Sequence, residues 1–136
     1  HVKKTLLELA KRGLKLAVLS DAPRYQAWSR LCYLQLQHFF DHVITFEDTQ
    51  VRKPAAAPFE RAIELLDMHP DEVIMVGDWP ERDMVGAHGV GIRTVYAKYG
   101  DTSGAAVSGA DFEIDDISEL VGIIDGLMGG GGEGGA

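Results

Sequence analysis

The sequence predicts an α/β domain, a Rossmann-like, three-layer α/β/α arrangement around a mostly parallel sheet. Short apolar runs, each long enough for one buried strand, alternate along the chain with longer segments whose apolar residues repeat at helical spacing. The chain has 136 residues, 46% of them hydrophobic, which suits one domain with a hydrophobic core. No internal repeat or domain boundary interrupts residues 1–128.

The first half of the chain predicts helix, strand, helix and strand in that order, over residues 2–12, 14–20, 25–37 and 42–46. The first helix is amphipathic, and Gly13 ends it in the position that helix C-termini favour. The two strands are short apolar runs of the kind that form buried parallel strands. The second helix is predicted from apolar residues at helical spacing, namely Tyr25, Trp28, Leu31 and Cys32.

In the second half, a polar loop over residues 47–54 precedes further alternation of helices and strands. The predicted helices cover residues 55–66, 80–88 and 117–124, and the predicted strands cover residues 72–78, 92–97 and 112–114. Pro58 suits the first turn of its helix. The Gly-rich segment 129–136 has no apolar surface to bury, so we expect a flexible tail outside the domain of residues 1–128.

Composition and charge narrow the range of partners. The formal net charge of −8 argues against non-specific binding to nucleic acid or to an anionic membrane surface. A small anionic substrate is still compatible with this net charge, because a few lysines or arginines at one site can outweigh it locally. No apolar run approaches the roughly 20 residues of a membrane span. Cys32 is the only cysteine, which excludes an intrachain disulfide, and we expect a cytoplasmic protein.

Polar residues end three of the predicted strands or their loops. The first strand runs into Ser20 and Asp21, the loop after the second ends in Arg52 and Lys53, and the third strand ends in Asp78. In an open α/β sheet, ligands bind outside the carboxyl ends of the strands. We therefore expect these positions to converge on one edge of the sheet and to form the functional site.

Asp78 and Asp83 have the spacing of a shared cation site. One carboxylate at a strand end and another a helical turn later can reach the same ion, and Mg²⁺ prefers oxygen ligands of this kind. Asp83 can bind the ion directly or orient one of its waters. The alternative is that Asp83 only complements a helix N-terminus and that Asp78 is an ordinary loop acid.

Ser20 and Lys53 are the candidate phosphate ligands. The Ser20 hydroxyl can donate to a phosphate oxygen, helped by backbone N–H groups of the turn that begins at Asp21. Lys53 precedes a helix and can neutralise a phosphate and a nearby carboxylate together. The alternatives are a turn-forming Ser-Asp pair and a solvated loop lysine. Arg24 and Arg52 are weaker candidates for the same role.

Trp79 directly follows Asp78, where a core residue is not expected. Two interpretations remain open: the indole lines the mouth of the site, or it covers a hydrophobic edge. Trp28, by contrast, is predicted to be a core or half-buried residue of its helix. Four histidines lack metal-ligand spacing and are interpreted as surface or satisfied residues, namely His38, His42, His69 and His88.

Four segments, taken in order, resemble those of the haloacid dehalogenase-like hydrolases. They are "VLSDA" (Val18–Ala22), "RKPAAAPF" (Arg52–Phe59), "GDWPERD" (Gly77–Asp83) and "GVGIRTVYAKYG" (Gly89–Gly100). The resemblance covers nearly all of residues 2–125. The Gly-Asp-x4-Asp element is moderately specific by itself, and its combination with Ser20 and Lys53 is strong.

The resemblance implies a Mg²⁺-dependent phosphatase that acts on a small phosphorylated molecule through an aspartyl-phosphate. In that scheme Asp78 holds Mg²⁺ and Asp83 supports it. Ser20, together with the adjoining position of Asp21, binds the transferred phosphoryl group. Lys53 stabilises the charge around the phosphate and the nucleophile, so Lys53 and Asp78 are the catalytic residues that the scheme finds in this sequence.

The sequence departs from the family's pattern at its start. The family's nucleophile and general acid/base lie in an Asp-x-Asp motif on a first strand, but this sequence opens at His1 before a helix and has no aspartate before Asp21. We therefore expect a fold without its first strand and assign no nucleophile. Because losing such a group costs on the order of 10⁶-fold in rate, we predict that the isolated chain is inactive or nearly so.

In the family's sheet, the missing strand lies between the strand that ends at Ser20 and the strand that ends at Asp78. Unpaired backbone groups in a buried sheet are costly. These two strands are therefore expected either to close on each other or to receive a strand from elsewhere. A second copy can supply it, in a homodimer or strand-swapped oligomer, and a longer parent gene would also explain the start at His1.

Two classes of function remain open from the sequence. The first is a hydrolase domain that is truncated or is completed by another chain. The second is a non-catalytic descendant that keeps the fold and serves as a binding or assembly module. A receiver-like phosphoacceptor domain is disfavoured, because such domains place their acidic cluster on early strands and the order of acidic residues here is different.

Overall fold

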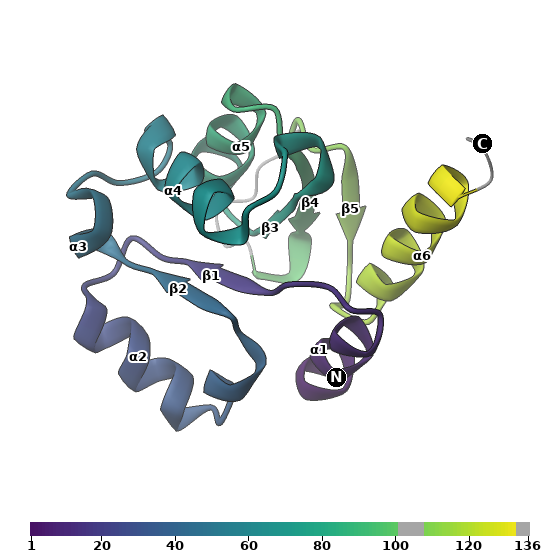
Figure 1. Ribbon diagram of the computed structural model, residues 1–136, viewed down its shortest axis with the longest axis horizontal. Coiled ribbons are helices and arrows are strands. Elements are labelled where there is room, and N and C mark those ends of the chain that lie inside the picture. Colours follow the sequence, from purple (N-terminus) through teal and green to yellow (C-terminus); the bar gives the residue numbers. More distant parts are fainter. Residues whose placement is uncertain (101–107, 133–136) are drawn as a thin grey trace.

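The computed structural model describes residues 1–100 and 108–132 (Figure 1). Its strands are β1 (Ala17–Leu19), β2 (His42–Ile44), β3 (Ile74–Gly77), β4 (Arg93–Ala97) and β5 (Phe112–Ile114). Its α-helices are α1 (Val2–Lys11), α2 (Arg24–Tyr33), α3 (Phe46–Thr49), α4 (Ala56–Leu66), α5 (Val85–Gly89) and α6 (Glu119–Gly132). Shorter helical turns are η1 (Gln37–Phe39), η2 (Pro70–Glu72), η3 (Pro80–Met84) and η4 (Lys98–Gly100).

The strands pair in parallel, which confirms the predicted α/β class. Strand β1 pairs with β2, and Ala17 lies opposite His42. Strand β4 pairs with β3 on one side and with β5 on the other. The two groups are separate sheets with the orders β1-β2 and β3-β4-β5. Within the described residues β1 does not pair with β3, so the two strands have not closed on each other.

Alternation along β3 sends side chains into two cores on opposite faces of the sheet. Ile74 and Val76 pack in a core to which α1, β4, β5 and α6 also contribute, through residues that include Leu9, Val95, Ile114, Leu120 and Ile124. Met75 packs on the other face, against Phe59 of α4 and Ala87 of α5. Helices therefore cover both faces of the sheet, as the three-layer prediction requires (Figure 1).

The free edges of β1 and β3 leave apolar side chains half-buried. Every residue of β1 and of β3 is only partly buried, whereas β4 is buried from Thr94 to Ala97. Strand β4 has a neighbour on each side, but β1 and β3 have one neighbour each. Parallel strands are normally buried on both faces. Within the described residues, β1 and β3 therefore each keep an unpaired edge.

Residues 46–49 form a helix, although the sequence predicted a strand end and a loop there. The backbone N–H of Thr45 donates to the Asp48 carboxylate at 2.6 Å, and the Thr45 side chain accepts from the backbone of Asp48. This is a capping box. Its Thr-x-x-Asp spacing is visible in the sequence, and the stabilised N-terminus allows one helical turn before the chain leaves the site edge.

Helix α2 differs from the prediction in its end and in its buried face. It ends at Tyr33 rather than near Gln37. Its buried residues are Ala27 and Leu31, while Tyr25 is 85% exposed and Cys32 is exposed. Apolar spacing indicated a helix correctly. Leu31, one of the residues that indicated the helix, is buried, but Trp28, predicted to be core or half-buried, is 40% exposed. Ala27 was missed because its side chain is too small to stand out.

At the C-terminus, α6 continues through Gly132, so the first part of the predicted flexible tail has helical backbone. Residues 133–136, the rest of that predicted tail, lie outside the described residues. The predicted strand over residues 112–114 is confirmed as β5. Among the described helices, none combines the length and the apolar character that crossing a membrane would need.

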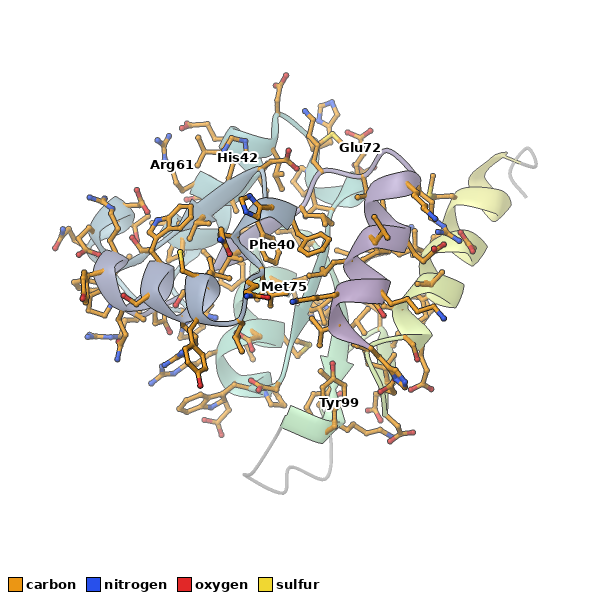
Figure 2. The ribbon with its side chains drawn as sticks, turned by 90° about the horizontal axis from the view of Figure 1, so that it is seen from below. Phe40, His42, Arg61, Glu72, Met75 and Tyr99 are labelled. Atoms are coloured by element: carbon orange, nitrogen blue, oxygen red, sulfur yellow. The ribbon has the colours of Figure 1, made fainter. Side chains whose placement is uncertain are left out.

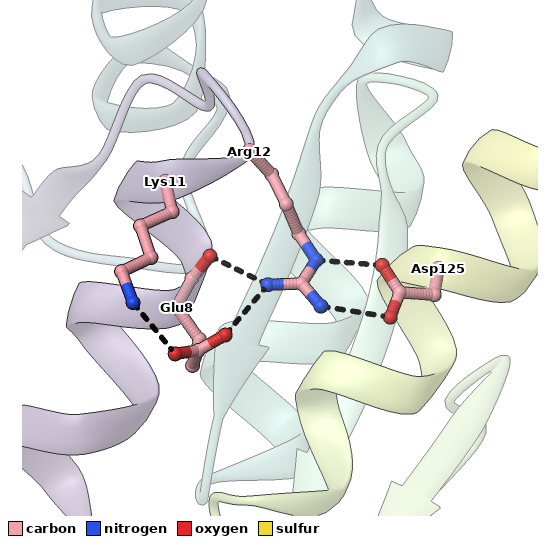
Figure 3. Close-up of polar contacts among 4 residues, drawn as sticks. All are labelled: Glu8, Lys11, Arg12 and Asp125. Atoms are coloured by element: carbon pink, nitrogen blue, oxygen red, sulfur yellow. Dashed lines mark hydrogen bonds and ion pairs between the residues drawn. The ribbon is translucent and has the colours of Figure 1, made fainter.

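Arg12 joins α1 to α6 on the outer side of the fold (Figure 3). Its Nε and Nη2 donate to the two carboxylate oxygens of Asp125 at 2.6 and 2.9 Å. Its Nη1 donates to the backbone carbonyl and the carboxylate of Glu8 at 2.7 and 3.2 Å. These hydrogen bonds from Arg12 hold the pKa of Asp125 and the pKa of Glu8 below the usual range for carboxyls.

The Arg12 network predicts a loss of stability at acid pH. A carboxyl whose pKa is lowered by folding adds stability above its unfolded pKa, and this is lost as the pH falls through the folded pKa. Because unfolded Asp and Glu titrate near pH ~4, the contribution is present at about pH 6 and is progressively lost between there and about pH 2. The urea midpoint should fall more between these pH values in the wild type than in Arg12→Gln, and equal falls would contradict the prediction.

Gly86 allows α5 to approach α4 closely. A Cβ at this position would overlap the aromatic ring of Phe59, which is 1% exposed. We predict that Gly86→Ala lowers the free energy of unfolding by roughly 1–3 kcal/mol, as overpacked cores do. The matched control is Gly89→Ala in the same helix, where nothing lies within 4 Å of an added Cβ. Chemical denaturation of both variants measures the difference, and equal midpoints would refute it.

Candidate functional site

The parallel strands direct their carboxyl ends toward one edge of the molecule (Figure 2). Glu72 and His42, at or before the starts of β3 and β2, lie at one end of the view, and Tyr99, which follows β4, lies at the other. The residues that follow β1 and β3 therefore emerge on the same edge as Tyr99. This is the edge on which the strand-end residues were expected to converge.

Ser20 and Asp21 form a tight turn after β1. The Ser20 N–H continues the ladder by donating to the Ile44 carbonyl at 2.9 Å, and the Ala22 N–H donates to Ser20 Oγ at 3.1 Å. Asp21 Oδ1 accepts the backbone N–H of Lys53 at 2.9 Å. The Ser20 oxygen therefore accepts within the turn while its O–H can still donate. Asp21 anchors the loop that contains Lys53.

Lys53 reaches across the edge between the two sheets. Its Nζ donates to the carbonyl of Leu19, at the end of β1, at 3.3 Å. The same Nζ lies 2.8 Å from Asp83 Oδ1, in the turn that follows β3. The pair is well shielded, because the side chains of Lys53 and Asp83 are only 13% and 6% exposed. Lys53 is therefore a largely shielded, paired cation and not a solvated loop lysine.

The backbone after β3 turns so that Asp83 points inward. The Trp79 carbonyl accepts the N–H groups of Arg82 and Asp83 at 3.0 and 2.7 Å, which forms the single turn η3. The Trp79 N–H in return donates to Asp83 Oδ2 at 3.1 Å. A Cβ on Gly77 would overlap the Asp83 carboxylate. Glycine at position 77 is therefore a condition for the inward position of Asp83.

Asp83 Oδ1 retains an unused hydrogen-bonding position. The oxygen is buried and accepts no hydrogen bond from any described residue. The Lys53 ammonium at 2.8 Å supplies charge, but it is not aligned as a hydrogen-bond donor. A buried oxygen in this state favours a further donor or cation beside it, which is compatible with a metal-bound water as Asp83's partner.

Asp78 lies apart from the buried pair. It is exposed, and a Cβ on Gly100 would lie 2.5 Å from its Oδ2, so its carboxylate faces the segment after β4. Burial raises the pKa of Tyr99, and the carboxylates of Asp116 and Asp78 add to that effect. The structure thus brings Asp21, Lys53 and Asp83 into one contact network. Ser20 adjoins it as the residue before Asp21, and Asp78 lies on the same edge.

Whether this site can hold Mg²⁺ depends on how many protein ligands the ion needs. The described residues contain no group of three or more His, Cys, Asp or Glu side chains arranged for a metal. Mg²⁺ keeps several waters and commonly uses one or two carboxylates together with substrate phosphate. Two carboxylates after β3, those of exposed Asp78 and of Asp83 with its unfilled Oδ1, match that smaller requirement in number. The assignment of Asp78 and Asp83 as metal residues stays a prediction.

Arg82 is a site residue that the sequence reasoning missed. Its Nη1 lies 3.2 Å from Asp21 Oδ2, so it links the turn after β3 to the turn after β1. Its guanidinium carbon lies 3.9 Å from the centre of the Trp79 ring. The i, i+3 spacing of Trp79 and Arg82 in a helical turn that starts at Pro80 was the available signal. The indole, 47% exposed, therefore lies at the edge where the site opens.

The two other arginines considered from the sequence have different partners. The backbone N–H of Arg24 donates to Glu47 at 2.7 Å, and its guanidinium lies 3.7 Å from Asp48. The Arg52 guanidinium lies 4.7 Å from the centre of the Phe46 ring. Neither contact involves the network of Lys53 and Asp83, so Arg82 is better placed than either.

The sequence matches a known protein family and several characterised proteins. Residues 1–97 match a family described as haloacid dehalogenase-like hydrolase. A glyceraldehyde 3-phosphate phosphatase of Pyrococcus furiosus is 32% identical over 126 residues, which are 90% of this chain and 52% of that protein. The pyrophosphatase PpaX of Bacillus mycoides is 34% identical over 131 residues, which are 94% of this chain and 60% of that protein.

A solved structure shows the same fold. The crystal structure of a HAD phosphatase from Thermococcus onnurineus is 36% identical, with a TM-score of 0.81, and the alignment covers 90% of this chain and 56% of that one. The chain therefore spans little more than half the length of the relatives it matches. With the family match over residues 1–97, the chain belongs to the haloacid dehalogenase-like hydrolases.

Proposed function

We propose that this chain provides the phosphate-binding and metal-binding half of a Mg²⁺-dependent phosphatase that acts on a small phosphorylated molecule. The observation that supports the proposal most strongly is the buried Lys53–Asp83 pair beside the Ser20–Asp21 turn, at the carboxyl ends of β1 and β3. The curated relatives are named as phosphatases of glyceraldehyde 3-phosphate and as a pyrophosphatase. Either kind of phosphorylated compound is a candidate substrate.

Each residue of the network has a defined task in this proposal. The Ser20 hydroxyl donates to an oxygen of the transferred phosphoryl group, and N–H groups of the Asp21 turn assist it. Lys53 balances the charge of that group from the buried side. Mg²⁺, held by Asp78 with Asp83 behind it, would supply further neutralisation of the phosphoryl oxygens. Asp21 positions the Lys53 loop, and any phosphate contact it makes comes from its backbone.

The carboxylates of the network are already engaged, so we assign none of them as the nucleophile. Asp21 accepts the Lys53 N–H and pairs with Arg82, and Asp83 is buried against Lys53. Covalent phosphoryl transfer needs a free carboxylate in line with the phosphorus. We therefore propose that the chain by itself is inactive or nearly so, and that the nucleophile belongs to a strand seated between β1 and β3.

A second candidate function is a non-catalytic assembly module. The observation that favours it is the pair of free strand edges, with half-buried apolar side chains along β1 and β3. Such edges accept an added strand, including one from a second copy in a homodimer or a strand-swapped oligomer. This candidate predicts oligomers or strand binding with no turnover under any condition.

Complementation by a peptide separates the two candidates. The purified chain is assayed on an aryl phosphate with and without Mg²⁺, alone and with a peptide that has an apolar strand followed by Asp-x-Asp. The hydrolase proposal predicts almost no turnover alone and Mg²⁺-dependent turnover with the peptide, which Asp78→Asn abolishes. Asp71→Asn, an exposed acid of η2 at the opposite end of β3, is the control that retains turnover.

Peptide binding without turnover would support the assembly module instead. Turnover by the chain alone, lost in Asp78→Asn, would show that some carboxylate of this chain replaces the missing nucleophile. That outcome would contradict the proposed inactivity and leave the proposed metal role intact.

The buried Lys53–Asp83 pair also predicts a stability effect. Lys53→Met leaves Asp83 as an unpaired buried charge and should lower the free energy of unfolding by about 3–5 kcal/mol. The double variant Lys53→Met with Asp83→Asn should recover a large part of that loss, because no charge remains. Lys98→Met is the matched control: Lys98 lies 3.3 Å from Asp115 in an exposed pair, whose loss costs at most about 1 kcal/mol.

Urea denaturation of the four proteins measures these differences. A double variant that is less stable than Lys53→Met would mean that the carboxylate is stabilised by other groups, and that the ion pair does not hold the edge together.

A further inference from the structure

Arg82 lies on the outer side of the site, and Lys53 lies on the inner side. The Arg82 side chain is 35% exposed and stacks on the exposed indole of Trp79, whereas Lys53 is 13% exposed and contacts Asp83 and the Leu19 carbonyl. The inner cation is therefore available only to a group that enters the network beside Ser20. Arg82, the outer cation, is available to the part of the same ligand that lies nearer the solvent.

Two contacts hold the Arg82 guanidinium in a defined place. Asp21 pairs with its Nη1 at 3.2 Å, and the Trp79 ring covers one of its faces at 3.9 Å. Asp21 is itself held by the Lys53 N–H at 2.9 Å. A guanidinium has five N–H donors in a rigid fork. Of these donors, only Nη1 makes a hydrogen bond to a described residue, namely Asp21. The remaining N–H donors can therefore bind a ligand oxygen.

The position of this guanidinium relative to Ser20 decides what it can bind. Asp21, its partner, is the residue after Ser20, so the guanidinium lies next to the turn proposed to hold the transferred phosphoryl group. The inner side of that turn is closed by the buried Lys53–Asp83 pair. Arg82 and Trp79, which are more exposed, lie on the outward side of that turn, where the rest of a phosphorylated ligand would extend.

We propose that Arg82 is a specificity-determining residue that selects phosphorylated ligands whose leaving group has an oxyanion of its own, a second phosphate or a carboxylate. The assignment rests on the proposed function, because it places the transferred phosphoryl group at Ser20 and Lys53. Charge-assisted bonds from a guanidinium fork to such an oxyanion are strong and geometrically specific. Trp79 is the positioning residue that holds the fork, and it also gives the binding event a fluorescence signal.

Binding measurements on the intact chain test the assignment without requiring turnover. Isothermal titration compares orthophosphate, which fills only the inner position, with inorganic pyrophosphate, which adds a second phosphate. EDTA is present so that no metal contributes. The wild type should bind pyrophosphate at least tenfold more tightly than orthophosphate. Arg82→Gln should remove about tenfold of that preference and leave orthophosphate binding nearly unchanged.

Control variants separate the local effect from net charge. Arg30→Gln removes the same charge from an exposed position of α2 and should keep the wild-type preference. Trp79→Leu keeps the Arg82 charge but removes its ring contact, and should lower the preference by a smaller factor. In a Trp28→Phe background, where Trp79 is the only indole, pyrophosphate should change the emission more than orthophosphate does.

The outcomes distinguish this inference from the proposed function. If both anions bind and Arg82→Gln lowers their affinities equally, Arg82 does not select the leaving group, and the phosphate site itself stands. The same conclusion follows if Arg30→Gln has the same effect as Arg82→Gln. If the wild type binds neither anion at millimolar concentration, the phosphate site at Ser20 and Lys53 is wrong and the assignment of Arg82 falls with it.

Discussion

The ion pair between Lys53 and Asp83 is the interaction on which the rest of the site depends. It joins the loop after β2 to the turn after β3, and Lys53 also contacts the end of β1. Buried charges are tolerated only when they are paired. Because Asp83 has no other cation beside it in the described structure, the loop that contains Lys53 must approach β3. Gly77 is needed for the same reason, because only a residue without a side chain leaves room for the Asp83 carboxylate.

The contact network also explains how two sheets whose strands do not pair with each other, within the described residues, keep their carboxyl ends together. Lys53 and Arg82 both cross from one sheet to the other, and Asp21 contacts both residues. These polar contacts act at one end of the strands only. Along the strands themselves, β1 and β3 keep free edges and half-buried apolar side chains. The polar end of the site is thus assembled, while β1 and β3 behind it each keep an unpaired edge within the described residues.

Most elements of the fold could be predicted from the sequence, because short apolar runs and helical spacing are local signals. The strand at residues 112–114 and the helix with Pro58 in its first turn are examples. For α2, helical spacing included Leu31, which is buried, but it could not show that Tyr25 and Cys32 are exposed, because only packing reveals that Ala27 lies on the buried face. The one-turn helix α3 was missed because its capping box lies at the end of a strand.

For the site, the sequence by itself determined which residues could meet: parallel strands put Ser20, Lys53 and Asp78 at one edge, whatever the details of packing. Only the tertiary structure decided the pairings. Asp83 turned inward to Lys53, Asp78 stayed exposed beside Gly100, and Arg82 reached Asp21, a residue 61 positions earlier in the chain. A strand-end pattern fixes positions along the backbone. The direction of each side chain depends on contacts between distant segments, which no local pattern specifies.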